Sequence, residues 1–368
     1  MMLVACESPA EPPPDAAFTT GRLGMNDVTM LLPLPATTST PTLLAMADGG
    51  DLVPRSLFTR VVSTPGDVLD PYEAFHVVAV RFDLCDRTQA GPCPAGADGR
   101  VRLVFQPMLP GMGRTQAADV ALHAFFPIPA ADLASVIGEL RELAAIGGTD
   151  PASPLAVSTA ITRPAYVTQL RALVLRYASA TKLTRLTLFA QKAISASLNW
   201  AFRGVELRGT VYVDMMIPSI DVAQQVAILV GAVPSYEVTP VADSPLGMTL
   251  ALDGRLFTAA AAGPQRQAVG ALAEALNPTL QGADTEQCVG CHVSTFLLAH
   301  RAQIAGIDAA TLPELFTSTY DLSIARGMSA TNDRSLRALG WLLDKPAISQ
   351  RVANDTAQVL TEIDKGEY

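Results

Sequence analysis

Hydrophobic and polar residues recur with two different periods along this chain, and these periods divide it into predicted strands and helices. Apolar side chains occupy every second position at Val78, Val80 and Phe82, which is typical of a strand. The same period recurs in further stretches, at 101–105, 120–126, 186–190 and 211–217. After Pro129 the spacing changes to three and four residues, which predicts an amphipathic helix that begins near Asp132.

The middle of the chain mixes both periods. It predicts helices at 167–177, 221–230 and 264–276, and strands at 236–241 and 247–257. Because no strict repeat and no βαβ series with a glycine fingerprint is present, the mixture indicates an α+β region over about 25–280.

The last part of the chain has the helical period almost throughout. Segments 293–304, 334–343 and 348–363 are predicted helices, so residues 281–368 are expected to form a small all-α domain. A stretch rich in glycine and proline at 147–154 marks a boundary in the preceding region. The predicted organisation is a tether at 1–24, an α+β domain at 25–150, a second α+β domain or a continuation of the first at 151–280, and the all-α domain at 281–368.

Composition narrows the class of partner. The chain has 368 residues, of which 49% are hydrophobic and 17% are charged, so it contains enough apolar material for ordinary cores. Its formal net charge of −9 argues against nucleic acid as a partner, because phosphate binding requires a basic face. No apolar run reaches the ~18 residues that a transmembrane helix needs, so any membrane attachment is expected through a lipid.

The clearest chemical motif is Cys288-Val289-Gly290-Cys291-His292, the C-x-x-C-H attachment signature of c-type haem. Each thiol can add to one vinyl group of the porphyrin, and the two intervening residues let one turn of backbone span both vinyls. The adjacent histidine then lies under the iron and offers a ring nitrogen as an axial ligand.

The segment of about eighty residues around this motif resembles a class I cytochrome c. The resemblance implies one covalent haem c, with Cys288 and Cys291 as thioethers and His292 as the proximal ligand. It also implies that the domain at 281–368 has the all-α cytochrome c-like fold. Residues 1–280 resemble no family of known activity.

The second axial ligand of such a haem is usually supplied from a loop well downstream of the motif. Met328 is the only methionine after the motif, so it is the expected sixth ligand. His300 is a rival, but it follows His292 on the same predicted helix and cannot easily reach the far face of the haem. His76 and His123 fall in strand patterns, and either could supply the ligand across a domain interface.

Cys85 and Cys93 are separated by eight positions, with glycine and proline between them. This spacing suits a small loop closed by a disulfide, which would indicate an oxidising compartment. The alternative is two unrelated free thiols.

The N-terminal segment Leu3-Val4-Ala5-Cys6 resembles a bacterial lipobox, in which the cysteine is acylated. A proline-rich polar stretch follows it and is typical of an extended tether. Only five residues precede Cys6, too few for a signal peptide, which indicates a true start further upstream or an accidental resemblance. The first reading predicts a lipoprotein of the cell envelope, in the periplasm or at the outer membrane.

These observations leave three functional hypotheses. The first is an exported, lipid-anchored, monohaem c-type cytochrome that carries single electrons to a redox partner protein and is not an enzyme. The second is a haem sensor or haem oxidoreductase with an open sixth site. The third is a haem-free surface lipoprotein in which Cys288 and Cys291 form a disulfide or bind zinc with His292 and His300.

Overall fold

The structure is a computed structural model of the whole chain. It describes residues 21–38, 42–62, 72–85, 93–94, 96–111, 114–192, 199–217, 223–229, 233–240, 247–323 and 336–367. Two predicted site residues, Cys6 and Met328, lie outside these ranges.

One large antiparallel sheet is the centre of the described structure. It has ten strands, and eight of them lie side by side in the order β1-β2-β3-β5-β6-β7-β9-β10. The other two are β4, which pairs with β3, and β8, which pairs with β7. The strands are β1 (Thr29–Leu31), β2 (Phe75–Asp83), β3 (Gly99–Pro110), β4 (Thr115–Ala117), β5 (Val120–Ile128), β6 (Arg185–Lys192), β7 (Asn199–Arg208), β8 (Val211–Asp214), β9 (Gln224–Leu229) and β10 (Ser235–Thr239). A separate hairpin is formed by β11 (Leu339–Leu342) and β12 (Lys345–Ile348).

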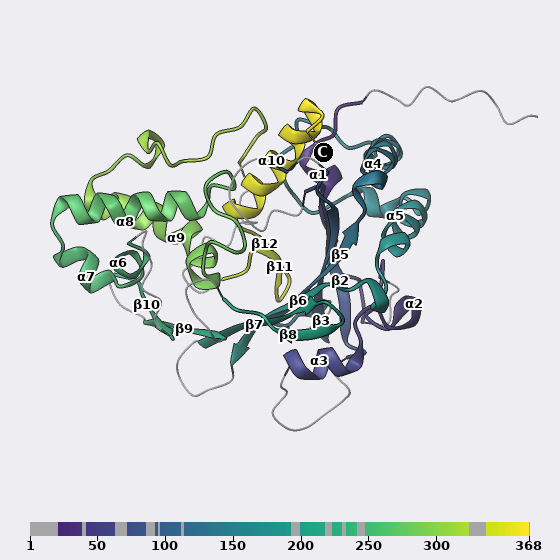
Figure 1. Ribbon diagram of the computed structural model, residues 1–368, viewed down its shortest axis with the longest axis horizontal. Helices are drawn as coiled ribbons and strands as arrows, with labels where there is room; N and C mark the ends of the chain where they lie inside the picture. The colour runs from purple at the N-terminus through teal and green to yellow at the C-terminus, as the bar shows by residue number, and fades with distance from the viewer. Residues whose placement is uncertain are drawn as a thin grey trace, which may run out of the picture.

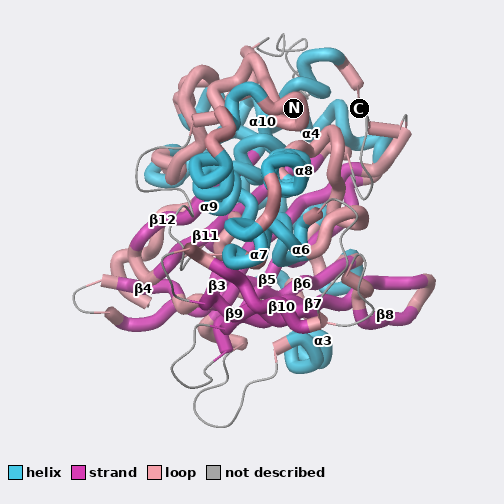
Figure 2. The backbone as a smooth tube through the Cα atoms, turned by 90° about the vertical axis from the view of Figure 1, so that its left-hand side faces the viewer, coloured by secondary structure: helices cyan, strands magenta, loops and turns pink. Residues whose placement is uncertain are grey.

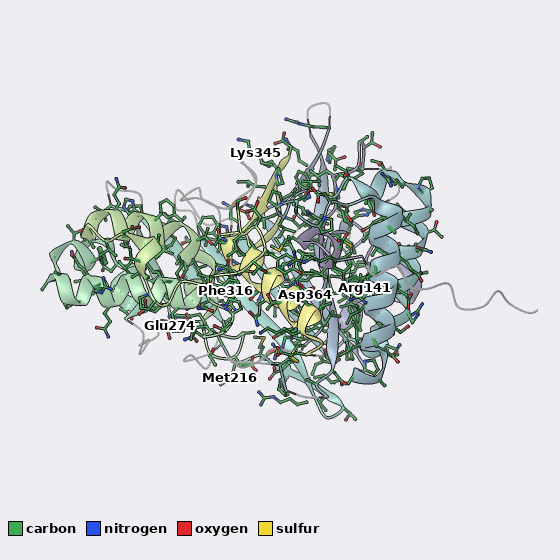
Figure 3. All side chains as sticks on the ribbon, turned by 90° about the horizontal axis from the view of Figure 1, so that it is seen from above. Arg141, Met216, Glu274, Phe316, Lys345 and Asp364 are labelled. Atoms are coloured by element: carbon green, nitrogen blue, oxygen red, sulfur yellow. A yellow bond between two sulfur atoms is a disulfide. The ribbon has the colours of Figure 1, made fainter. Side chains whose placement is uncertain are left out.

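Helices lie on both sides of this sheet. Figures 1 and 3 show α4 and α5 on one side of β2 and β5, with α10 on the other side and α8 and α9 beyond it. Figure 2, turned by 90°, shows the strands of the large sheet below α8, α9 and α10. The α-helices are α1 (Met25–Val28), α2 (Asp48–Asp51), α3 (Arg55–Val61), α4 (Leu133–Gly147), α5 (Pro164–Tyr177), α6 (Met248–Leu252), α7 (Gly254–Ala259), α8 (Ala262–Ala275), α9 (Cys288–Ala305) and α10 (Gln350–Lys365). Short 3-10 helices occupy Ala130–Asp132, Ala160–Thr162, Ala180–Lys182 and Ala309–Thr311.

The alternation that predicted the strands gives the sheet two different faces. Phe82, Leu103 and Phe126 share one face of the sheet, and each is 0% exposed. Burying a large apolar side chain of this kind stabilises the fold by ~1.5–3 kcal/mol. Gly99 of β3 lies on the same face and approaches Leu133 of α4, so this face lies toward that helix. The alternate positions carry polar residues, including Arg81 and Arg102, which are register partners on β2 and β3. That polar face lies toward α9 and α10, so it is covered by protein.

The C-terminal part of the chain differs from the prediction. The expectation of a small all-α cytochrome c-like fold there is wrong, because the segment contains the β11–β12 hairpin and packs on the large sheet. Its buried side chains belong to the same hydrophobic cluster as those of the sheet. The predicted helix at 334–343 instead supplies β11, in which Gly340 takes a backbone conformation that favours glycine (φ 152°). The spacing of leucines alone was compatible with a helix, but Gly340 and Pro346 favour a hairpin.

Two elements of the middle region also differ from the prediction. Residues 221–230 were expected to be helical, but β9 occupies Gln224–Leu229, where Gln224, Val226 and Ile228 alternate as buried positions. Residues 247–257 were expected to be a strand, but they form α6 and most of α7. Both segments are short and apolar, so their period alone did not decide between helix and strand.

A buried glutamine joins the hairpin to the sheet. Gln106 of β3 is 0% exposed, and its carboxamide nitrogen donates to the carbonyls of Trp341 at 2.9 Å and Ala118 at 3.0 Å. Its carbonyl oxygen accepts from the Trp341 backbone nitrogen at 2.7 Å. Gly340 makes this approach possible, because a Cβ at that position would lie 2.6 Å from the Gln106 oxygen.

We predict that Gln106→Leu destabilises the whole fold by about 2–4 kcal/mol. The leucine fills a similar space but leaves the backbone groups of Trp341 without their partner, and each buried unsatisfied polar group costs ~1–3 kcal/mol. Denaturant unfolding measures the difference. Gln191→Leu, at an exposed position of β6, is the matched control and should change the stability by less than about 0.5 kcal/mol. Equal effects of the two substitutions would contradict the role of Gln106.

Candidate functional site

A cavity lies between the polar face of the sheet and helices α9 and α10. Its wall includes Cys288, Cys291 and His292 of α9 together with Arg102 and His123 of the sheet. The space between the lining atoms, counted with its opening to solvent, is about 1370 Å³, and the part that the centre of a water molecule can reach is about 220 Å³. The cavity thus combines the motif residues with the charged face of the sheet.

The motif forms the first turn of α9, which starts at Cys288. Buried Gln224 of β9 holds this turn on the sheet. Its carbonyl oxygen accepts from the Val289 backbone nitrogen at 2.9 Å, and its nitrogen donates to the Gln287 side-chain oxygen at 2.8 Å. The first N–H groups of a helix have no partner within the helix, so Gln224 satisfies one of them and fixes the orientation of the motif.

The two motif cysteines have free thiols, and both are half-buried. Burial raises the pKa of Cys288 to about 12, with Cys291 as a further cause, and burial raises the pKa of Cys291 to about 11. A dithiol redox centre requires a thiolate, and such centres lower the thiol pKa. These cysteines are therefore protonated near neutral pH and have the opposite character to a catalytic C-x-x-C pair.

His292 is fixed by contacts on two sides. Its ring stacks on Phe189 with centroids 5.7 Å apart and meets Phe202 edge-on at 4.9 Å. Its Nδ1 donates to the backbone carbonyl of Leu336. Burial lowers the pKa of His292, so the neutral ring predominates, and the bond to Leu336 assigns the proton to Nδ1. The other nitrogen, Nε2, is then left with a lone pair.

Paired charges fill one end of the cavity. Asp83 is 4% exposed in its side chain and makes ion pairs with Arg81 at 2.5 Å, Arg102 at 2.8 Å and Arg100 at 3.3 Å. Burial alone would raise the pKa of Asp83, but the arginines, Arg102 first, bring it well below its ordinary range. One carboxylate is shared by three guanidinium groups, so this cluster has a net positive charge.

A further pair of charges joins the sheet to α10. Arg351 donates from Nε to Asp355 at 2.8 Å, and its other nitrogens donate to the carbonyls of Ala275 and Gln281 at 2.8 and 2.7 Å. Asp355 also lies 3.5 Å from Arg81. These contacts place α10 over the cavity and leave the donors of Arg351 engaged in the fold.

The structure brings together three of the predicted site residues, Cys288, Cys291 and His292, which all line the cavity. It also joins Cys85 to Cys93 by a disulfide, and Cys85 lines the same cavity.

The two remaining candidate histidines are elsewhere. His76 forms a hydrogen bond with Thr42 at 3.0 Å, and His300 stacks on Phe296 with ring centroids 5.8 Å apart. Neither lines the cavity. No group of three or more histidine, cysteine, aspartate or glutamate side chains in the described residues is arranged to hold a metal ion. The zinc set of Cys288, Cys291, His292 and His300 is therefore not assembled.

Sequence reasoning missed the arginines and Gln224 as parts of this site. The signal was present, because Arg81, Asp83, Arg100 and Arg102 sit at alternate strand positions and so share one face of a sheet. A polar face of a strand is usually solvated, and nothing local shows that helices α9 and α10 cover it.

The chain matches no protein-family model, no curated protein and no solved structure. In the part of the chain that the structure describes, no helix combines the length and apolar character required to span a bilayer.

Buried Glu286 predicts a pH dependence of stability. Burial raises its pKa to about 7 from an ordinary value of 4.5, although its carboxylate accepts from the Gln287 backbone nitrogen at 3.0 Å. The folded state binds this proton more tightly than the unfolded state. The resulting stabilisation is complete below about pH 4.5 and is lost as the pH rises through 7.

Glu286→Gln should remove this contribution, because glutamine keeps the acceptor oxygen and never ionises. We expect the variant to gain up to about 3 kcal/mol relative to the parent between pH 4.5 and pH 8. Urea unfolding across that range measures it. The exposed Glu142→Gln on α4 serves as control and should leave the profile unchanged. A parallel pH profile for Glu286→Gln and the parent would refute the assignment.

Proposed function

We propose that this chain is an exported monohaem c-type cytochrome that carries single electrons. The observation that carries the proposal is the convergence of Cys288, Cys291 and His292 on one cavity, with both thiols free. When bound, haem c supplies an iron that cycles between ferrous and ferric forms.

The two thiols suit thioether attachment. Both cysteines stand on the first helical turn of α9 and line the same wall of the cavity. In the attachment, each sulfur bonds to one carbon of a vinyl group and the thiol hydrogen goes to the other carbon, so the step is an addition that needs no oxidant. Both thiols are free, as this addition requires.

His292 has the features expected of an axial ligand. An axial histidine usually donates from one ring nitrogen to a second residue, which sets the tautomer and orients the ring. Leu336 provides that acceptor through its backbone carbonyl, and Phe189 limits rotation of the ring by stacking. Nε2 is the nitrogen that remains to bind iron.

The arginines on the cavity wall suit the two carboxylates of a porphyrin. Arg81, Arg100 and Arg102 all contact the carboxylate of Asp83, and Arg81 also lies 3.5 Å from Asp355. Charge-assisted hydrogen bonds from guanidinium groups are the strongest contacts that a protein offers to carboxylates. The local excess of positive charge contrasts with the net charge of −9 for the chain and supports an anionic occupant.

The role of an electron carrier requires a redox partner protein and no substrate. A cofactor held in the cavity next to the half-buried Cys288 and Cys291 would suit electron transfer on collision with that partner. The Cys85–Cys93 disulfide supports an oxidising compartment, and the lipobox-like Cys6 supports a lipid anchor in the cell envelope.

The proposal is tested by producing the full chain in the periplasm of a host with c-type cytochrome maturation. The protein should be coloured, show sharp reduced bands, and keep its haem after denaturation and acid-acetone extraction. Cys288→Ala with Cys291→Ala should abolish this covalent haem completely. His300→Ala, on the same helix but outside the cavity, should retain it. A colourless parent protein, despite maturation of a co-expressed reference cytochrome, would overturn the proposal.

A further inference from the structure

The polar face of the sheet offers a second axial ligand that differs from the one expected. A six-coordinate haem on His292 needs a neutral nitrogen or sulfur donor from a second element. Among the described residues that line the cavity, His123 and Met215 carry such a donor outside the motif and the disulfide. All four histidines of the chain are described, and only His123 and His292 line the cavity.

Strand register places His123 close to His292. His123 of β5 pairs with Thr187 of β6, and the next residue on the same face of β6 is Phe189. Diagonal neighbours of this kind have Cβ atoms within about 7–8 Å. His292 stacks on Phe189 with ring centroids 5.7 Å apart. The two histidines therefore occupy adjacent places above the same two strands, one from the sheet and one from α9.

The imidazole of His123 has no hydrogen-bond partner in the described residues. Its ring lies beside that of Phe125, with centroids 6.5 Å apart, and the side chain is half-buried and lines the cavity. The ring nitrogens are therefore open to a group that occupies the cavity. Histidine is the commonest metal ligand among side chains, and an iron atom would satisfy a ring nitrogen that the protein leaves free.

Met215 is the weaker candidate for a physical reason. It follows the short strand β8 at the side of the sheet, and its backbone nitrogen donates to the Gly204 carbonyl at 2.9 Å. A methionine side chain packs as an apolar group, and leaving its sulfur without a partner costs little free energy. The position of Met215 on the cavity wall is therefore explained without a bond to iron.

We infer that His123 is the second axial ligand of the haem, opposite His292. The inference rests on the proposed function. It replaces Met328 as the expected ligand and favours an electron carrier over a sensor with an open sixth site. Two imidazoles leave no position for a diatomic ligand, and without a thioether the reduction potential is lower than that of a His–Met cytochrome.

Spectroscopy of the full-length holoprotein tests this inference. The parent should be low-spin in both oxidation states, should not bind carbon monoxide when reduced, and should show the electron paramagnetic resonance and near-infrared signature of two histidine ligands. Signatures of a methionine ligand, or a five-coordinate parent that binds carbon monoxide, would overturn it. These readouts need no variant, so they hold even if a substitution impairs folding.

Variants identify the residue. His123→Gly should become high-spin and bind carbon monoxide, and added imidazole should restore the low-spin spectrum. His123→Met should stay six-coordinate with a raised potential. Met328→Leu and Met215→Leu are the matched controls and should keep the parent spectrum. A change confined to either methionine variant would overturn the inference while leaving the proposed function intact, whereas absence of covalent haem from the parent would remove both.

Discussion

The pairing of buried charges on one face of the sheet is the condition on which the rest of this structure depends. Ionised groups cannot be covered by helices unless each has a partner, because desolvation costs several kcal/mol for every ion. Asp83 supplies that partner to Arg81, Arg100 and Arg102, and Asp355 extends the pairing to α10. The helices can therefore rest on a charged surface and enclose a cavity there.

The opposite face of the same sheet provides the stability. It carries aromatic and branched side chains that are buried beneath α4, and the buried cluster continues through the C-terminal segment. Burial of this apolar face fixes the register of the strands. The residues of the other face are then not needed for register and can be polar or charged. Gln106 and Gln224 attach the C-terminal elements to the sheet by hydrogen bonds. Gln106 bonds to Trp341 of β11, and Gln224 bonds to Val289 and Gln287 at the start of α9.

The sequence revealed most of the strands of the sheet and the motif itself, for reasons that the structure makes clear. Strand alternation at Val78–Phe82 reports one buried face directly, and the spacing of Cys288, Cys291 and His292 is a local chemical requirement. The C-terminal fold could not be read in the same way. Leucine spacing there is compatible with a helix, and only long-range contacts with Gln106 decide in favour of the hairpin. His123 likewise looks like an ordinary strand residue until β6 and α9 place it beside His292.

The account as a whole depends on covalent attachment of haem at the motif, and intact mass spectrometry of the exported chain tests it most directly. Under denaturing conditions the polypeptide should be heavier by the mass of one haem, and proteolysis should locate the added mass on the peptide that contains Cys288 to His292. An unmodified mass, or a mass two hydrogens lower at Cys288 and Cys291 as in a disulfide, would contradict the account.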